Sequence, residues 1–313
     1  TITDSTIKTS NTRAIKVSSG TVNINGGIYE VDASDCSNGC APFLPYSGIL
    51  NIDGGTYQGD KLNYLVINQG ATINIGGNNK ELAITKLRLW SNSGTINFKN
   101  GTLTTTTNAV TIRNGKINVT GGKIETSSGS GIYFPTTDVT DASATVSGGT
   151  IIGVTAGVYL NSVANLDVSG GTIKATGNVG IFNNGTGTVN VTGGTIYSAD
   201  AENQTGISNK AGGVINIGTK DGSVNTTSPT IYSYRSFGVY NENGTWNFYD
   251  GVLYAPKKYN SSPSALESGY SIVSDADSTY GYKTYLVKNY TVTFYKNQDY
   301  VQAKNSLIAV ISG

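Results

Sequence analysis

The stretch TVNVTGGTI at residues 188–196 contains the pattern that decides the fold. Two apolar residues, Val189 and Val191, flank Asn190, and a glycine pair follows. Alternation with a period of two puts the flanking side chains on one face of a β-strand and the amide on the other. Glycine takes positive φ without the steric cost of a Cβ, so the pair predicts a sharp corner directly after the strand.

Related windows recur along the chain at spacings of roughly 21 to 30 residues, which is typical of solenoid coils. They begin at Thr21, Ile49, Thr72, Thr95, Lys116, Ser143, Asn165, Thr188, Val214 and Thr245. We expect their apolar flankers to line one continuous core. A single coil buries too few apolar side chains to offset the entropy lost when it is ordered, so the coils must stack.

Each coil contains two further short strands. One follows the glycine corner, and the other lies later in the coil, as in GIYFP from Gly131 and GVYLN from Gly157. Three strands per coil predict an all-β fold, a single-stranded parallel β-helix (β-solenoid) of about ten coils. We expect it to be right-handed, by analogy with parallel crossover connections.

The regular pattern stops near Tyr254. We therefore expect residues 1–255 to form the parallel β-helix and residues 256–313 to form a linker and a small C-terminal β cap or module. A connector rich in Pro and Ser opens the second segment, and residues 285–287 and 291–295 have the composition of strands.

Two columns of asparagines are predicted to form side-chain hydrogen-bond ladders between stacked coils. The outer column is interrupted by Thr145 and Asp167 and contains Asn23, Asn51, Asn74, Asn97, Asn118, Asn190, Asn216 and Asn247. The inner column lies in the last coils and contains Asn183, Asn209 and Asn241. Because an unpaired buried amide costs about 1 to 3 kcal/mol, we expect the inner amides to stack in register.

The charge balance excludes one large class of partners. The chain has 21 Lys and Arg residues and 20 Asp and Glu residues, for a formal charge of +1, so the sequence predicts no nucleic-acid binding. No apolar run approaches the roughly 20 residues that span a bilayer, and no membrane insertion is expected. The N-terminus has no signal-peptide pattern. It begins at Thr1 without Met, which indicates a processed or excised segment.

The only cysteines, Cys36 and Cys40, lie in an insertion at residues 31–46, and His is absent. A zinc site is therefore not expected, and the sequence indicates no metal and no cofactor. A local disulfide and two unpaired thiols both remain open. A disulfide would stiffen the insertion and would indicate an oxidising, extracellular compartment.

Windows of the form G-T-[VI]-N-[VI]-x-G-G-T-[IY] resemble the pectate-lyase-like β-helix domains of bacterial cell-surface proteins, especially large adhesin-like proteins of Gram-positive gut bacteria. The later stretch GYSIVSDADSTYGYKTYLV, at residues 269–287, is similar to segments that join such helices to further β modules. The resemblance implies the fold over most of the chain. It leaves two functions open, because such domains include carbohydrate-active enzymes and non-catalytic adhesion stalks.

Catalysis on this fold uses clustered carboxylates, often with calcium and a basic residue, or paired acids with a His. The sequence has no His, and its acids lie on different coils or in loops, at Asp53, Asp60, Asp138, Asp141, Asp167 and Asp250. We therefore predict that the chain is not an enzyme. The alternative is a carbohydrate-active β-helix, either a polysaccharide lyase or hydrolase or a carbohydrate-binding protein.

An aromatic stripe is predicted on the outer face of the third strand of each coil. It contains Tyr133, Tyr159, Phe182 and Tyr240, with Ser208 between the last two. Such rings can stack on sugars or seat a partner, or they can form cross-strand pairs that only favour the sheet. The sequence thus predicts a secreted, structural or adhesive segment of a bacterial surface protein, with glycans or host surface proteins as its partners.

Overall fold

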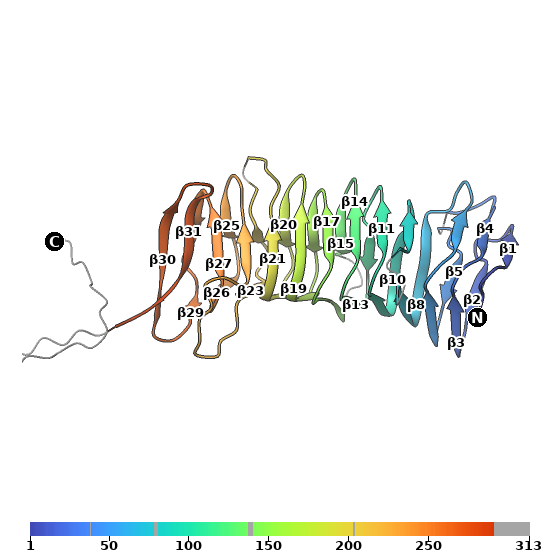
Figure 1. Ribbon diagram of the computed structural model, residues 1–313, viewed down its shortest axis with the longest axis horizontal. Helices are drawn as coiled ribbons and strands as arrows, with labels where there is room; N and C mark the ends of the chain where they lie inside the picture. Colours follow the sequence, from blue (N-terminus) through green and yellow to red (C-terminus); the bar gives the residue numbers. More distant parts are fainter. Residues whose placement is uncertain (38, 78–80, 137–139, 203, 291–313) are drawn as a thin grey trace, which may run out of the picture.

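The alternation of apolar and polar residues produces a stack of short parallel strands that winds into a rod (Figure 1). The structure is a computed structural model that describes residues 1–37, 39–77, 81–136, 140–202 and 204–290. The described residues form an all-β parallel solenoid of about 11 coils and contain no helix. The predicted fold class is confirmed. No stretch of the described chain forms a helix with the length and apolar character needed to cross a membrane.

The first sheet contains the strands around the outer asparagines. They pair in parallel, in a register that places each asparagine beside its equivalent on the next coil, as for Asn190 and Asn216. The strands are β3 (Thr21–Ile24), β6 (Ile49–Ile52), β8 (Tyr64–Ile75), β10 (Arg88–Phe98), β13 (Gly115–Val119), β16 (Ala142–Val146), β19 (Asn165–Ala175), β21 (Thr188–Tyr197), β23 (Val214–Ile217) and β26 (Thr245–Phe248).

The second sheet follows the glycine corners. In β19 and β21 the strand continues through the corner, so their later residues belong to this sheet. Three N-terminal strands form a separate sheet on the same side of the rod: β1 (Thr6–Thr9), β4 (Ile28–Val31) and β7 (Thr56–Gln58). The others are β9 (Ala83–Thr85), β11 (Thr102–Thr105), β14 (Lys123–Thr126), β17 (Thr150–Gly153), β24 (Thr230–Tyr232) and β27 (Val252–Ala255).

The third sheet closes each coil. It includes the first halves of β8 and β10, which then continue into the first sheet. Its other strands are β2 (Ile15–Val17), β5 (Phe43–Pro45), β12 (Val110–Ile112), β15 (Ser130–Phe134), β18 (Ala156–Leu160), β20 (Val179–Asn183), β22 (Ile207–Asn209) and β25 (Phe237–Asn241). The coil therefore has the three predicted strands.

One apolar lumen runs along the rod. Ile52, Val119 and Val191 have no exposed surface, and a single cluster of buried residues extends from the first coils to the last. The corner glycines let the coils stack closely. Gly194 has a φ of +78°, and a Cβ on it would lie 2.8 Å from the backbone of Gly170 in the preceding coil. Both the torsion angle and the contact require glycine at this corner.

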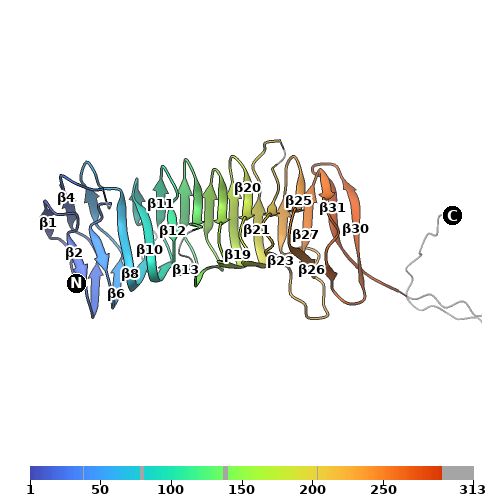
Figure 2. The ribbon, with the colours of Figure 1, turned by 180° about the vertical axis from the view of Figure 1, so that it is seen from behind.

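Antiparallel strands cover the C-terminal end of the rod (Figure 2). Two short strands, β28 (Lys257–Tyr259) and β29 (Ala265–Leu266), first extend the parallel pairing into the segment predicted to be a connector. A hairpin of β30 (Tyr270–Asp277) and β31 (Gly281–Lys288) follows, and β31 pairs antiparallel with β27. The strand predicted at 285–287 is confirmed within β31, and the one predicted at 291–295 lies outside the described residues.

Candidate functional site

Three aromatic rings of the predicted stripe lie in contact on the outer face of the third sheet. Tyr133 and Tyr159 meet edge to face, with centroids 5.6 Å apart, and Tyr159 and Phe182 meet at 4.7 Å with their planes inclined by 32°. All three rings are half-buried. Burial raises the pKa of the Tyr159 hydroxyl above its usual value, and the nearby Tyr133 adds to this effect. The rings form cross-strand pairs and still present surface to solvent.

The stripe is interrupted at Ser208, and the interruption creates a hollow. Ser208 lies in register with Phe182 on one coil and with Tyr240 on the next, and its small side chain is only 3% exposed. Phe237 packs beside Tyr240, with centroids 5.8 Å apart. The resulting hollow has a volume of about 530 Å³ and is lined by these four residues among others. This volume lies within the range of small-ligand sites, about 300 to 1,000 Å³.

The wall of this aromatic hollow contains a polar group without a partner. Thr205 lines the hollow, is 4% exposed, and its Oγ1 makes no hydrogen bond within the described chain. A buried hydroxyl without a partner costs free energy that a hydrogen-bonding ligand would recover. At the rim, Lys210 pairs with Glu242 at 3.3 Å, and its Nζ lies 5.9 Å from the Phe182 ring centroid. Apolar rings and hydrogen-bonding groups thus surround one space.

The outer asparagines form two ladders of hydrogen bonds in which each amide donates to the preceding coil. In the first, Asn118, Asn97, Asn74 and Asn51 donate in turn, and Asn51 donates to Asn23, whose own amide donates to the Thr1 hydroxyl at 3.4 Å. The distances between the asparagines lie between 2.6 and 2.9 Å. In the second, Asn247 donates to Asn216, Asn216 to Asn190, and Asn190 to Asp167, at 2.7 to 2.8 Å. These bonds run along the rod and join neighbouring coils.

The inner asparagines donate in the opposite direction, toward the following coil. Asn183 donates to Asn209 at 3.1 Å, and Asn209 donates to Asn241 at 2.7 Å. Each also donates to a backbone carbonyl, as Asn209 does to Gly213 at 2.9 Å. Asn183 and Asn209 are fully buried, and Asn241 is half-buried at the end of the column. These amides occupy lumen positions and join three successive coils by hydrogen bonds.

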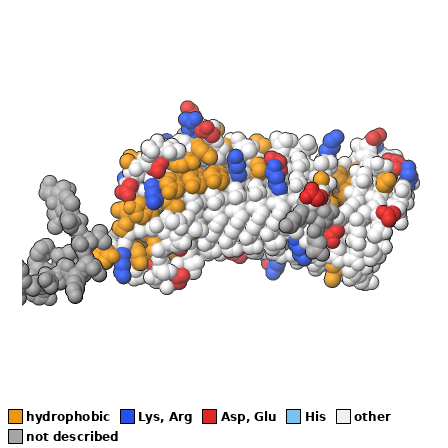
Figure 3. All heavy atoms as spheres, in the orientation of Figure 1, with side chains coloured by type: hydrophobic (Ala, Val, Ile, Leu, Met, Phe, Trp, Pro, Cys, Tyr) orange, Lys and Arg blue, Asp and Glu red, His pale blue; other side chains and the backbone are white. Residues whose placement is uncertain are grey.

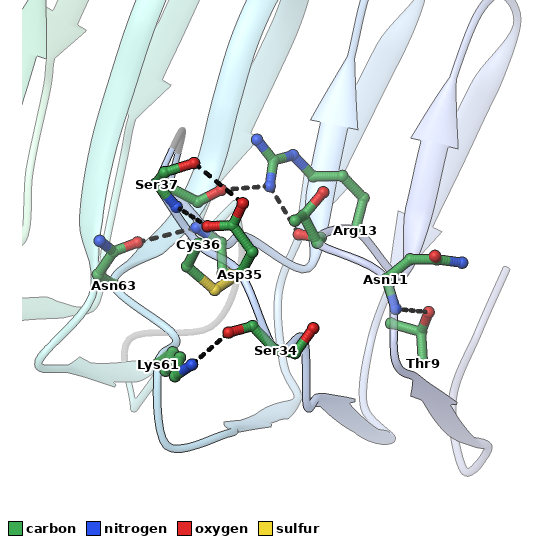
Figure 4. The surroundings of a disulfide bond; sticks show 12 residues. Thr9, Asn11, Arg13, Ser34, Asp35, Cys36, Ser37, Lys61 and Asn63 are labelled. Atoms are coloured by element: carbon green, nitrogen blue, oxygen red, sulfur yellow. Dashed lines mark hydrogen bonds between the residues drawn. A yellow bond between two sulfur atoms is a disulfide. The ribbon is translucent and has the colours of Figure 1, made fainter.

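Cys36 and Cys40 are joined by a disulfide, which closes a small loop beside the third sheet (Figure 4). Cys40 is buried with Val31 and Ala33 in a second, minor core. Its backbone N–H donates to Asn63 Oδ1 at 3.1 Å, which ties the loop to the start of β8. The disulfide therefore stiffens an insertion packed against the rod.

The second sheet carries a tyrosine cluster that the repeat pattern did not predict. Tyr197, Tyr232 and Tyr254 stack nearly parallel on successive coils, with centroids 4.8 and 5.1 Å apart. Tyr280 of the C-terminal hairpin leans on Tyr232 at 5.1 Å and on Tyr234 at 5.8 Å. Figure 3 shows hydrophobic side chains gathered at this end of the rod, near β21, β27 and β31. The repeated Thr-Ile-Tyr at 195–197 and 230–232 was the available signal.

Within the described ranges, no three His, Cys, Asp or Glu residues gather into a group that could hold a metal ion. Of the acids considered above, Asp138 lies outside the described residues. Burial raises the pKa of Asp250, which accepts hydrogen bonds from the backbone N–H groups of Gly251 and Asn225. Asp250 lies directly before a glycine corner, a position that favours Asp because its side chain can bond to the turn backbone.

Comparison with known proteins identifies no relative of this chain. No protein-family model, no curated protein and no solved structure matches this chain. What is established is therefore the architecture, a parallel β-solenoid of about 11 coils.

Proposed function

We propose that this chain is a non-catalytic segment of an extracellular bacterial surface protein whose rod presents the third sheet to glycans. The observation that carries the proposal is the aromatic hollow, in which Phe182, Phe237 and Tyr240 surround Ser208. Aromatic rings offer an apolar face to the C–H groups of a sugar ring, and neighbouring polar groups bind its hydroxyls. The unpartnered hydroxyl of Thr205 lies in the wall of the same hollow.

The surface location has two supports. The Cys36–Cys40 disulfide fits an oxidising compartment, since such bonds are rare in the cytosol. The repeat windows resemble the pectate-lyase-like domains of adhesin-like surface proteins, as noted above. An elongated rod also suits a segment that holds a contact face, or a distal module, away from a cell.

The non-catalytic part of the proposal is supported by the sequence. The chain has no His, and its acids are scattered over different coils. The hollow is lined by aromatic, hydroxyl and amide side chains and by Lys210, and no carboxylate is among its described lining residues. This set of groups suits binding better than general acid and base catalysis, which needs a group that exchanges a proton near neutral pH.

A glycan array probed with the intact chain tests the proposal. We expect binding to a subset of glycans, weakened about tenfold or more by Phe182→Ala or Tyr240→Ala, because stacking on an aromatic ring is lost. Tyr290→Ala is the matched control, since Tyr290 is 68% exposed and lies beyond the hairpin. Equal binding by the wild type and both hollow variants would contradict the site. Cleavage of any bound glycan would contradict the non-catalytic role.

A further inference from the structure

A second, larger hollow lies near the N-terminal end of the third sheet, where the disulfide loop packs against β8 and β10. Its volume is about 700 Å³. Residues far apart in the sequence meet there, and four of them carry the argument: Arg13, Tyr64, Arg88 and Trp90. None of the described lining residues is Asp or Glu. This arginine hollow therefore differs in charge from the aromatic hollow.

Arg13 is half-buried in the wall of this hollow. Its Nη1 donates to the carbonyls of Thr12 and Gly39, both at 2.6 Å, so backbone atoms of the loop fix its position (Figure 4). Its Nε is buried and has no hydrogen-bond partner in the described chain. Burial lowers the pKa of Arg13, as expected for a cation moved out of water. An anion bound beside it would relieve this cost.

Asp35, the acidic side chain labelled in Figure 4, does not supply that anion. Asp35 accepts a hydrogen bond from the backbone N–H of Ser37 at 2.8 Å and another from the Ser37 hydroxyl at 3.3 Å. These bonds lower the pKa of Asp35, with a smaller contribution from Lys61. Asp35 is thus held within its own loop and does not line the hollow.

Arg88 lies over an aromatic wall. Its Cζ is 4.2 Å from the centroid of Tyr64, and its Nε makes a long hydrogen bond of 3.5 Å to the carbonyl of Asn63. Tyr64 in turn meets Trp90 edge to face at 6.0 Å. Trp90 donates from Nε1 to Asn92 at 2.8 Å, which fixes the orientation of the indole. A stacked guanidinium beside a fixed indole is suited to an anionic group carried on a flat apolar ring.

The disulfide loop completes the wall on the other side. Gly39 has a φ of +80°, and a Cβ on it would lie 2.6 Å from the Tyr64 ring, so the loop backbone rests directly on that ring. The carbonyl that orients Arg13 belongs to the same residue. The short disulfide ring therefore keeps the arginine and the aromatic wall in one arrangement before any ligand binds, which lowers the entropic cost of binding.

We propose that the arginine hollow binds a sugar that carries an oxyanion, either a sulfate ester or a carboxylate. The oxyanion lies against Arg13 and Arg88, and the sugar ring lies against Trp90 and Tyr64. This inference rests on the glycan-binding role proposed above but concerns a separate site and a different ligand class. Asn92 accepts from Trp90 and donates to Gln69, so the amide N–H groups of Asn63 and Gln69 in the same lining are the ones suited to the sugar hydroxyls.

Calorimetric titration of the intact chain tests the proposal with five probes: a sulfated disaccharide, a uronic-acid disaccharide, the neutral parent of each, and inorganic sulfate. We expect one anionic disaccharide to bind at least tenfold more tightly than its neutral parent, and binding to weaken as salt is raised. Comparing the affinities of the sulfated and the uronic-acid disaccharide shows whether the site prefers a sulfate ester or a carboxylate. Equal binding of the neutral parent, or no binding of either anionic sugar, overturns the proposal. If inorganic sulfate binds as tightly as the sulfated sugar, the proposed contact of the sugar ring with Trp90 and Tyr64 is overturned.

Variants separate this site from the aromatic hollow. Arg88→Gln should weaken binding of the anionic sugar about tenfold or more, because a charge-assisted bidentate contact is lost. Arg88→Lys keeps the positive charge but loses the bidentate guanidinium, so its affinity for the anionic sugar should lie between those of the wild type and Arg88→Gln. Arg235→Gln is the matched control, since Arg235 pairs with Asp200 at 2.6 Å elsewhere on the rod. Full binding by Arg88→Gln contradicts the site. Phe182→Ala should leave this binding intact, so the two proposals fail independently.

Discussion

The side-chain amide of Asn190 donates a 2.7 Å hydrogen bond to the carboxylate of Asp167, and the second outer ladder ends at that contact. Asp167 lies in register with Thr145, which lies in register with Asn118 at the end of the first ladder. A carboxylate accepts hydrogen bonds and has no N–H to pass on. The outer column is therefore divided into two segments, and interior members of each segment have partners on both sides.

Asn97 is an interior member of the first ladder. Replacing it with Ala removes the bond to Asn74 at 2.9 Å and the bond from Asn118 at 2.8 Å. We expect a loss of about 1 to 2 kcal/mol in the free energy of unfolding, measured by urea titration. Asn118→Ala is the matched control, because Asn118 stands at the end of the ladder and bonds only one ladder neighbour, and its loss should be about half as large. Equal losses of unfolding free energy in the two variants would show that the second ladder bond of an interior asparagine adds no stability.

Asn209 tests the inner column. Leu160 occupies the equivalent lumen position two coils earlier, so Asn209→Leu keeps a side chain that this lumen accommodates. It leaves the Oδ1 of Asn241 without its donor and removes one of the two donors to the carbonyl of Gly213, which still accepts from the backbone N–H of Thr245. We expect a loss of about 2 to 4 kcal/mol by chemical denaturation, because buried polar atoms lose their partners. The control is Asn184→Ala, which removes one amide bond to Asn161 and should cost less than about 1 kcal/mol.

Asp250 makes stability depend on pH. Burial, with smaller contributions from Asp221 and Glu267, raises the pKa of Asp250 in the folded chain. A raised carboxyl pKa means that the contribution to stability is complete below the pKa of the unfolded chain and is lost as pH rises through the folded value. Asp250→Asn lacks this loss, so its melting temperature relative to wild type should be higher at pH 7 than at pH 3.

Asp221 provides the opposite sign as a control for that experiment. Hydrogen bonds from the Ser223 hydroxyl and backbone N–H lower its pKa. Its contribution is present at neutral pH and is lost as pH falls through the lowered value. Asp221→Asn should therefore be destabilised relative to wild type at pH 7, and the difference should shrink as the pH is lowered. If both variants shift in the same direction, the assignment to individual carboxyls is wrong.

Tyr280 attaches the C-terminal hairpin to the rod through the tyrosine cluster. Tyr280→Ala removes its ring contacts with Tyr232 and Tyr254, at 5.1 and 5.6 Å. Each aromatic contact contributes about 0.5 to 1.5 kcal/mol. We expect amide hydrogen exchange in β30 and β31 to accelerate about tenfold, with little change in the central coils. Tyr290→Ala should leave the exchange unchanged, and equal acceleration in the two variants would assign no docking role to Tyr280.

The fold could be predicted because its main constraint repeats. Val189 and Val191 alternate around Asn190 as their equivalents do on other coils, and a shared lumen leaves no other register for them. The strands β28 and β29 were missed because each is too short to show a period. Tyr259 is held there by packing on Trp246, with centroids 5.8 Å apart, and a sequence pattern cannot show such a contact.

The sites could be predicted only in part. Tyr133, Tyr159 and Phe182 share one strand position, so their alignment follows from the repeat. The aromatic hollow also needs Phe237, which lies three residues before Tyr240 and outside the repeating position. The arginine hollow depends on an insertion folding back on the rod, which brings Arg13 and Arg88 together from distant coils. Contacts of this kind arise from tertiary packing and leave no periodic signal.

The direction of the coil-to-coil bonds has a mechanical consequence. Thr1 and the C-terminal hairpin lie at opposite ends of the rod, so a pull between them acts along the long axis (Figure 1). Backbone bonds and amide ladders also run along that axis, and each coil touches only its neighbours. Such a load breaks the hydrogen bonds that hold an end coil before it breaks those of the coil behind it. Under tension the rod should unfold one coil at a time from an end and so lengthen in steps. When the force is removed, the coils should refold.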